Sequence, residues 1–229
     1  MNIDQFEKKA RVIFQDKNLL GQAFVHRSYL NENRDFPLGH NERLEFLGDA
    51  VLELVTTEYL YRKYPDKTEG EMTSLRSALV NANTLYVVGV NLGVNDYLLL
   101  SRGETKDTGR ARQYILANTI EAIIGAVYLD QGYETAKKFI YEHITPLIEK
   151  IISEGSWIDA KSRFQEQAQD VVGVTPLYKT LKEIGPDHDK HFTVGVYLGS
   201  ELIAEGEGDS KQNAEQEAAR RASRAKDWE

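Results

Sequence analysis

Three carboxylates share one face of the segment NERLEFLGD, residues 41–49. At about 100° per residue, a helix brings Glu42, Glu45 and Asp49 within about 60° of one another. Like charges this close raise the cost of ionising each neighbour, so packing gives no reason to gather them, whereas a divalent cation does. A solvated acidic face is the alternative, and Glu53, which falls on the same face, shows that spacing does not decide between the two.

A second pair of oxygen donors lies in the segment ILANTIEAIIGAVYLD, residues 115–130. Asn118 and Glu121 are about one helical turn apart, in a stretch apolar enough to be central in a domain, where an unpaired carboxylate is costly. Oxygen donors from two helices, with no histidine or thiol among them, suit Mg²⁺ or Mn²⁺ rather than zinc. Glu69, beside Glu71 in a polar turn, is either a further member of the set or surface charge.

Phe46 departs from the helical pattern, because at about 40° it lies on the carboxylate side rather than on the apolar face. A single chain would leave this ring in water. Burial against a second copy across a two-fold axis is one solution, and it would bring two acidic clusters to one shared surface. A loop of the same chain covering the ring is the other. The opposite face is the expected core stripe, formed by Leu44, Leu47, Val51, Leu54 and Val55.

The composition excludes several classes of protein. The 229 residues include no cysteine, which excludes disulfides, thiolate zinc sites and cysteine nucleophiles and suits a reducing compartment. No apolar run approaches the roughly 20 residues of a membrane helix, and the N-terminal segment does not resemble a targeting sequence. We therefore expect a soluble, cytoplasmic protein without a membrane partner. The formal charge of -8 argues against a nucleic-acid partner, since phosphate binding usually accompanies a basic excess.

The hydrophobic pattern changes along the chain, and the predicted fold class is mainly α with a small mixed domain. Residues 1–153 are expected to form an all-helical domain, 154–159 a linker, and 160–229 an α-β-β-β-α domain. The helices expected in the first domain span 18–30, capped by Asp16; 42–64, capped by Asn41 and ended by Pro65; 66–93, in two pieces; 114–132, ended by Gly132; and 133–155, with a polar loop over 101–113.

The smaller domain is expected to place three strands between two helices. The first helix spans 160–173, and the extended segments 176–185, 191–199 and 201–208 follow, with a tight turn at Gly199-Ser200. Alternation in the middle strand puts four apolar residues on one face, namely Phe192, Val194, Val196 and Leu198. The closing helix, 210–228, carries a stripe of small side chains suited to lying on a sheet, namely Ala214, Ala218, Ala222 and Ala225.

The segment HNERLEFLGDAVL resembles the signature motif of ribonuclease III. Companion segments appear in order: FVHRSYLNE before it, EGEMTSLRSALVNANTL and RGETKDTGR after it, and then ILANTIEAIIGAVYLDQG. The C-terminal part is similar to a double-stranded-RNA-binding domain in SRFQEQAQ, GPDHDKHFTV and GDSKQNAEQEAARRA. Together these segments cover nearly the whole chain in the two-domain order of bacterial ribonuclease III.

The resemblance implies a site and a reaction. The implied metal ligands are Glu45, Asp49, Asn118 and Glu121, and the implied catalytic acids are Asp49, Glu121, Glu42 and Glu69. Phe46 matches the aromatic residue that family members insert into the partner subunit of a homodimer. The implied reaction is Mg²⁺-dependent hydrolysis of duplex RNA, with Mn²⁺ as a substitute, to 5′-phosphate and 3′-hydroxyl ends with two-nucleotide 3′ overhangs. Ribosomal-RNA precursors and structured messages are the implied substrates.

The resemblance also implies contacts with double-stranded RNA in the smaller domain. The residues concerned are Gln165, Glu166, His188, Lys211 and Gln212. The first two would approach one minor groove and His188 the next, while Lys211 and Gln212 would face phosphates across the major groove. Each also has a simpler interpretation as a surface or loop residue, and His26 is interpreted as a packed, hydrogen-bonded residue rather than a catalyst.

Two positions depart from the family pattern. Asn118 stands where the motif has aspartate, so one ligand charge is missing and the cation should bind more weakly; the residue is either a natural variant or a replacement that cripples cleavage. Gln212 stands where lysine is usual. The domain from Asp159 onward has 10 Lys and Arg against 14 Asp and Glu, so its affinity for RNA should be modest and fall with salt.

Two other functions remain open from the sequence. A double-stranded-RNA-binding protein that holds duplexes with little or no cleavage is compatible with Asn118 and Gln212. A helical metal-dependent hydrolase of small phosphate compounds is compatible with the acidic residues alone, but it gives no role to the second domain.

Overall fold

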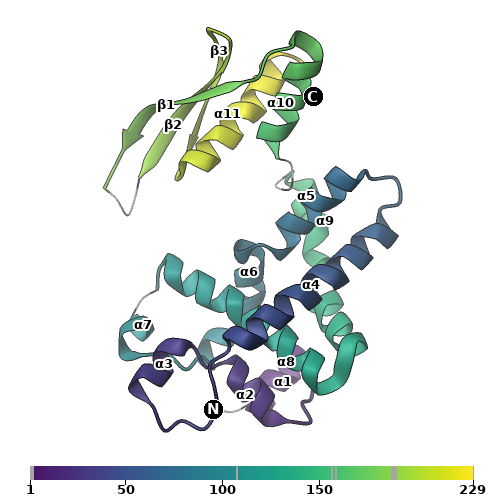
Figure 1. The fold of residues 1–229 in the computed structure, drawn as a ribbon, viewed down its shortest axis with the longest axis vertical. Helices are drawn as coiled ribbons and strands as arrows, with labels where there is room; N and C mark the ends of the chain where they lie inside the picture. The colour runs from purple at the N-terminus through teal and green to yellow at the C-terminus, as the bar shows by residue number, and fades with distance from the viewer. Residues whose placement is uncertain (1–2, 107, 156, 158, 187–189, 229) are drawn as a thin grey trace. The chain divides into compact units, whose positions relative to one another are not determined.

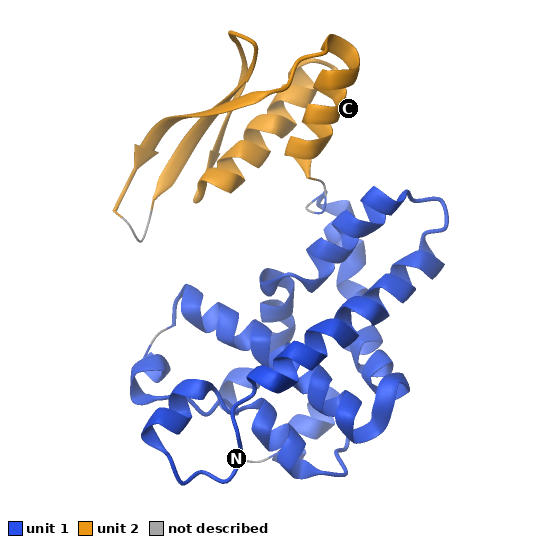
Figure 2. Ribbon diagram, in the orientation of Figure 1, with its two compact units in different colours: residues 1–157 blue, residues 158–229 orange. Residues whose placement is uncertain are grey.

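The computed structural model describes residues 3–106, 108–155, 157, 159–186 and 190–228. The chain divides into two compact units, residues 1–157 and 158–229 (Figure 2). The predicted fold class, an all-helical domain followed by a small α-β-β-β-α domain, is confirmed. Within the ranges given above, no helix has the length and apolar character needed to span a membrane.

The larger unit is built from helices, with one isolated bridge between Val25 and Leu99 in its described part. Its α-helices are α1 (Ile3–Ala10), α2 (Lys17–Ala23), α3 (Arg27–Glu32), α4 (Glu42–Lys63), α5 (Glu69–Val80), α6 (Ala82–Leu92), α7 (Arg102–Lys106), α8 (Arg110–His143) and α9 (Ile148–Ser153). Two short 3₁₀ helices, η1 (Val94–Asp96) and η2 (Thr145–Leu147), connect them.

The long helices α4 and α8 pack against each other at the centre of this unit (Figure 1). The segment predicted to be central is buried, since Ile120, Ile123 and Ile124 of α8 expose no surface. The helix kinks at Gly132, whose φ of 80° ends the regular turn where the sequence predicted a stop. Side chains at the α4–α8 contact are therefore positioned by the best-packed part of the unit.

The predicted helix over residues 18–30 is wrong, because it is two helices, α2 and α3. Asp16 caps α2 as expected, accepting a hydrogen bond from the Asn18 N–H at 2.9 Å. Between the two helices the backbone pairs with a distant segment: the Leu99 N–H donates to the Phe24 carbonyl at 2.9 Å. A long-range contact of this kind leaves no periodic signal in the sequence.

Three further expectations of the first domain need correction. Asn41 precedes α4 but does not cap it, because its side-chain amide donates to the Ala23 carbonyl at 3.1 Å instead. The polar loop over 101–113 contains α7 and the start of α8. The predicted helix over 133–155 is interrupted by η2, where Pro146 has no N–H to donate to the preceding turn. The division of residues 66–93 into two helices is confirmed.

The smaller unit is an antiparallel three-stranded sheet with two helices packed on it. Its elements are α10 (Ala160–Val172), β1 (Leu177–Ile184), β2 (His191–Leu198), β3 (Glu201–Gly208) and α11 (Lys211–Ala225), in the sheet order β1-β2-β3. The alternation predicted for β2 is confirmed by burial of Val194 and Val196. The alanine stripe is correct except at Ala225, which is exposed because α11 ends there, and Ala219 is buried in addition.

Candidate active site

The α4–α8 contact has a glycine on each helix at the point of closest approach. A Cβ on Gly48 would lie 1.7 Å from the Glu121 carbonyl oxygen, and a Cβ on Gly125 would lie 2.2 Å from a carbonyl oxygen of α4. No larger residue fits at either position, so the two backbones are in direct contact. Gly48 lies between Glu45 and Asp49 on α4, and Gly125 follows Glu121 by one turn on α8. The contact therefore holds acidic side chains of both helices at one crossing.

Side chains predicted as oxygen donors meet at this crossing. Asn118 Nδ2 donates a hydrogen bond of 3.0 Å to Glu45 Oε1 and joins α8 to α4. Glu121 feels the negative charges of both Asp49 and Glu45. Across the described ranges, no side-chain hydrogen bond or ion pair reaches the carboxylates of Asp49 and Glu121. The acids are brought together without a positive partner.

Burial and neighbouring charge both raise the pKa of Glu121 and of Glu45. Burial raises the pKa of Glu121 to about 8, and the charges of Asp49 and Glu45 add to the shift. Burial and then the charge of Glu42 raise the pKa of Glu45, while the hydrogen bond from Asn118 acts in the opposite direction. Perturbed carboxyl groups at one crossing are typical of a functional site.

The donor set fits a hard divalent cation by its chemistry, because it offers carboxylate and amide oxygens only. In the part of the chain that the structure describes, no group of three or more Asp, Glu or His side chains is gathered closely enough to enclose a metal ion by itself. A cation at this crossing would therefore need the amide oxygen of Asn118 or water as further ligands. Within this cluster, Asn118 joins the two helices through its hydrogen bond to Glu45.

Glu42 lies at the edge of this cluster and differs from its members in having basic side chains beside it. Its carboxylate lies 3.3 Å from Arg27 Nη1 and 3.7 Å from His40 Nδ1. Close by, His26 is hydrogen-bonded as predicted: its ring accepts from the Ser28 N–H at 3.3 Å and caps α3. Burial lowers the pKa of His26, which favours the neutral ring that this hydrogen bond requires.

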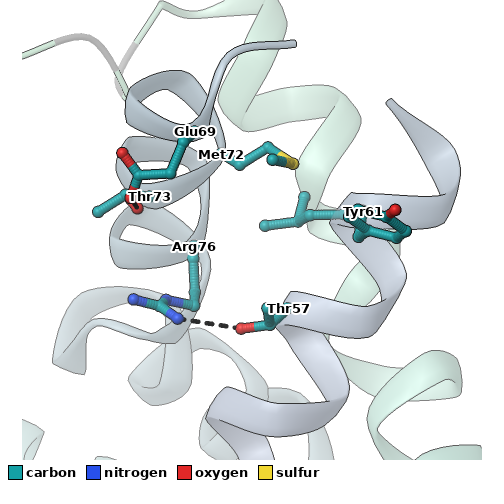
Figure 3. Close-up of a pocket in the computed structure, with 7 residues that line it drawn as sticks. Thr57, Tyr61, Glu69, Met72, Thr73 and Arg76 are labelled. Atoms are coloured by element: carbon teal, nitrogen blue, oxygen red, sulfur yellow. Dashed lines mark hydrogen bonds between the residues drawn. The ribbon is translucent and has the colours of Figure 1, made fainter. Parts of the chain in front are cut away.

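Glu69 is separated from the crossing within one chain. It begins α5 and accepts a hydrogen bond from Thr73 Oγ1 at 3.0 Å. Glu69 is one of the residues that line a cavity of about 170 Å³ between α4 and α5 (Figure 3). The cavity is lined by Thr57, Leu60, Tyr61, Glu69, Met72, Thr73 and Arg76. Thr57 follows Asp49 by about 12 Å along the axis of α4, so Glu69 lies away from the acidic cluster.

An exposed apolar stripe runs along α4 beside the acidic face. Phe46, Leu54 and Tyr61 are 82%, 59% and 71% exposed, and their helical angles fall within about 80° of one another. The prediction that Phe46 faces away from the core is confirmed. The assignment of Leu54 to the core was wrong, because this residue sits at the margin of the buried face and the neighbouring helices do not cover it.

The proposed RNA-contacting residues lie on the surface of the smaller unit. Gln165 and Glu166 are exposed on α10, and Lys211 and Gln212 are exposed in the first turn of α11. Lys211 Nζ lies 3.9 Å from Glu183 Oε2, so an acidic neighbour competes with phosphate for this charge. His188 lies outside the described residues.

Gly48 and Gly125 are positioning residues that the sequence interpretation missed. Each sits inside a helical, largely apolar run, where glycine is unfavourable by about 0.5–1 kcal/mol relative to alanine. That cost is a signal of close backbone approach, and both glycines lie within one turn of predicted ligands. The two glycines together would have predicted that the helices carrying them, α4 and α8, cross at this point.

Two family models match the chain. Residues 16–148 match the ribonuclease-III-like model, and residues 160–225 match the double-stranded RNA binding motif. The helical unit with its acidic crossing and the α-β-β-β-α unit thus define a two-domain protein of the ribonuclease III class.

Relatives match over nearly the full length. Ribonuclease 3 of Enterococcus faecalis is 44% identical over 218 residues, which are 95% of this chain and 94% of that protein. Ribonuclease 3 of Borreliella burgdorferi is 42% identical over 97% of this chain and 91% of its own length. A structure of the nuclease domain of ribonuclease III from Campylobacter jejuni, described for flexibility in its dimer-forming region, has a TM-score of 0.57 and 41% identity, covering 65% of this chain and 97% of that one. The chain belongs to the ribonuclease III family.

Proposed function

We propose that this protein is a double-strand-specific endoribonuclease. It hydrolyses phosphodiester bonds in duplex RNA to 5′-phosphate and 3′-hydroxyl ends with two-nucleotide 3′ overhangs, in ribosomal-RNA precursors and structured messages of the cytoplasm. One observation carries the proposal: Asn118 of α8 donates a hydrogen bond to Glu45 of α4, and Glu121 lies near the charges of Asp49 and Glu45. The same chain also has a domain of the double-stranded-RNA-binding class.

Glu45, Asp49, Asn118 and Glu121 are the residues that would hold Mg²⁺, or Mn²⁺ in its place. When bound, the cation supplies positive charge for the phosphate and makes water at the site more acidic. The chain's own contribution is positional, because the direct backbone contact at Gly48 fixes where the donors of both helices stand. The negative charge of the acidic cluster repels phosphate until the cation binds.

The exposed stripe of α4 supports a homodimer. Phe46 and Tyr61 lie at opposite ends of the stripe, and Leu54 lies almost midway between them. Two copies of α4 paired antiparallel about a two-fold axis near Leu54 would place Phe46 of each copy at the cavity beside Tyr61 of the other. A cavity of about 150 Å³ accepts benzene, so the cavity of about 170 Å³ is large enough for the ring. The same pairing would bring Glu69 of one copy toward the acidic cluster of the other.

Replacing Phe46 with alanine tests the dimer. We expect the dissociation constant measured by sedimentation to rise by about 30-fold or more, as for an aromatic anchor in an interface. The control is Ile13→Ala, which removes a side chain that is 77% exposed but lies outside α4. A Phe46→Ala protein that self-associates as tightly as the Ile13→Ala protein would contradict this arrangement.

Cleavage of a labelled RNA duplex of about 30 base pairs tests the function. The parent and the Asn118→Asp protein are incubated with the duplex over a Mg²⁺ series. We expect the parent to cut at high Mg²⁺ and the Asn118→Asp protein to cut at lower Mg²⁺, because the added carboxylate strengthens cation binding. Absence of both cleavage and a binding shift in the parent would overturn the proposal.

A second function is favoured by one observation, the neutral amide at Asn118 bonded to Glu45. It is a double-stranded-RNA-binding protein that holds duplexes with little cleavage. In the same experiment this function predicts a shifted, uncut duplex with the parent at every Mg²⁺ concentration, and cleavage only with the Asn118→Asp protein.

A further inference from the structure

Asn118 makes the one side-chain hydrogen bond that reaches the carboxylates of Glu45, Asp49 and Glu121 in the described part of the chain. Its geometry fixes the orientation of the amide. An ionised carboxylate accepts hydrogen bonds and cannot donate, so the amide nitrogen of Asn118 must face Glu45. Asn118 Nδ2 then lies 3.0 Å from Glu45 Oε1 and ties α8 to α4 across the crossing.

In this orientation the atom of Asn118 that lies beside Glu45 is a nitrogen, which cannot ligate a cation that Glu45 also binds. A hard cation is bound by the amide oxygen, because the amide nitrogen offers no lone pair for it. To present its oxygen to a cation that Glu45 also binds, the Asn118 side chain must turn over about its terminal torsion, which has two broad preferred orientations. Turning breaks the bond to Glu45 and releases that carboxylate as well. One rotation therefore frees two of the oxygen donors together.

We propose that Asn118 works in two positions: it clamps Glu45 through its nitrogen when no cation is bound, and it turns to offer its oxygen when a divalent cation arrives. The inference rests on the cation site of the proposed function. Compared with an aspartate at this position, Asn118 binds the cation more weakly but makes the α4–α8 crossing more stable when no cation is bound. An aspartate at this position has no donor, so it would repel Glu45 in the absence of a cation and attract the cation more strongly in its presence.

Thermal unfolding of the full chain in EDTA and in Mg²⁺ tests the clamp. In EDTA we expect the Asn118→Asp protein to melt about 3–8 °C below the parent, because a hydrogen bond is replaced by two facing acceptors. In saturating Mg²⁺ the melting temperature of the Asn118→Asp protein should rise more than that of the parent, and titration calorimetry with Mn²⁺ should show about tenfold tighter binding. An Asn118→Asp protein that melts at or above the parent in EDTA overturns the inference.

A double-variant cycle separates the clamp from a general effect of charge. In Glu45→Gln, the residue at position 45 gains an amide that can donate to Asp or accept from Asn. The additional change Asn118→Asp should then lower the melting temperature in EDTA by less than about 2 °C. If Asn118→Asp lowers the melting temperature as much in the Glu45→Gln protein as in the parent, the Asn118–Glu45 contact does not cause the loss of stability. That result would overturn the clamp.

The melting order, that is, whether the parent or the Asn118→Asp protein has the higher melting temperature in EDTA, does not depend on catalysis. If the parent fails to cut RNA at any Mg²⁺ while the melting order and the cycle hold, the proposed function fails and the clamp stands. If the parent cuts RNA but the melting order is reversed, the function stands and the clamp fails.

Discussion

Two groups of acidic side chains lie on the same helical unit, and their surroundings are opposite. At the N-terminal seam, Glu7 is 5% exposed and accepts from the Phe14 N–H at 2.7 Å while forming an ion pair with Lys17. Asp130 accepts from the Gln15 and Asp16 N–H groups, both at 2.8 Å. At the α4–α8 crossing, Glu121 is half-buried, and in the described part of the chain no donor or cation reaches it.

This difference in partners distinguishes acids that stabilise the fold from acids that are candidates for a function. A carboxylate that receives N–H donors and a cation from its own chain is fully used by the fold, and it ties helices together. A half-buried carboxylate surrounded by other carboxylates makes the fold less stable, so its position needs a reason outside the fold. The acids of the N-terminal seam therefore help to hold the unit together, whereas the acids of the α4–α8 crossing are candidates for the proposed cation site.

Gly48→Ala should have the largest effect of any change that touches the crossing. The new Cβ would lie 1.7 Å from the Glu121 carbonyl oxygen, and separating the two helices should lower the free energy of unfolding by about 3–5 kcal/mol. Chemical denaturation measures this value. Gly70→Ala is the control: its added Cβ meets no atom within 4 Å, and the protein should be stabilised by about 0.5–1 kcal/mol. Equal effects of the two substitutions would refute the close contact.

Glu121→Gln should separate activity from stability. We expect the cleavage rate on duplex RNA to fall about 10²–10³-fold, as for loss of one preorganised electrostatic group. The melting temperature in EDTA should rise by about 2–4 °C, because a carboxyl that is unfavourable in the folded state has been neutralised. Glu134→Gln, an exposed acid on the same helix, should change neither quantity. A fall in both activity and melting temperature would place Glu121 with the structural acids.

Glu7→Gln should show the reverse pattern. The substitution removes the charge that pairs with Lys17, and because Lys17 is 45% exposed the free energy of unfolding should fall by only about 1–3 kcal/mol. The cleavage rate, measured at a temperature where both proteins are folded, should stay within about twofold of the parent. A loss of activity larger than the loss of folded protein would contradict the separation of the two groups.

Asp130→Asn should have the smallest effect and a defined pH dependence. Burial raises the pKa of Asp130, but the hydrogen bonds from the Asp16 and Gln15 N–H groups outweigh it, so the net shift is downward. Such a group adds stability above its unfolded pKa of about 3.9, and that stability is lost as the pH falls through the lower folded value. We expect a loss of about 1 kcal/mol at pH 7.

The difference between the parent and the Asp130→Asn protein should shrink as the pH falls below about 4. Denaturation curves across the pH range measure this difference. A difference that grows toward acid pH would show that the two N–H groups do not favour the charged form of Asp130.

Local signals in the sequence predicted most of the fold. Helical periodicity identified the central segment of α8, and the stop at Gly132 follows from glycine's access to positive φ. The break between α2 and α3 was not predictable, because it depends on a pairing of Phe24 with Leu99 that is distant in the chain. Asn41 illustrates the same limit: its side chain is used in a tertiary hydrogen bond rather than in a local cap.

The members of the candidate site stay a prediction, and their geometry could not be predicted. Residue types and spacing made Glu45, Asp49 and Glu121 candidates without excluding Glu53, and the resemblance to ribonuclease III supplied the choice between them. The sequence could not show that Glu69 lies beside a separate cavity, because its position depends on how α5 packs on α4. Nor could it show which atom of Asn118 faces Glu45, which depends on the distance between two helices.

Titration calorimetry with Mn²⁺ tests most directly whether the α4–α8 crossing is a cation site. The full-length parent, the Glu121→Gln protein and the Glu7→Gln protein are titrated under the same conditions. We expect the parent and the Glu7→Gln protein to bind with the same affinity, and the Glu121→Gln protein to bind at least about tenfold more weakly, because one charged ligand is gone. Equal affinity in all three proteins would contradict the assignment of the cation to this crossing.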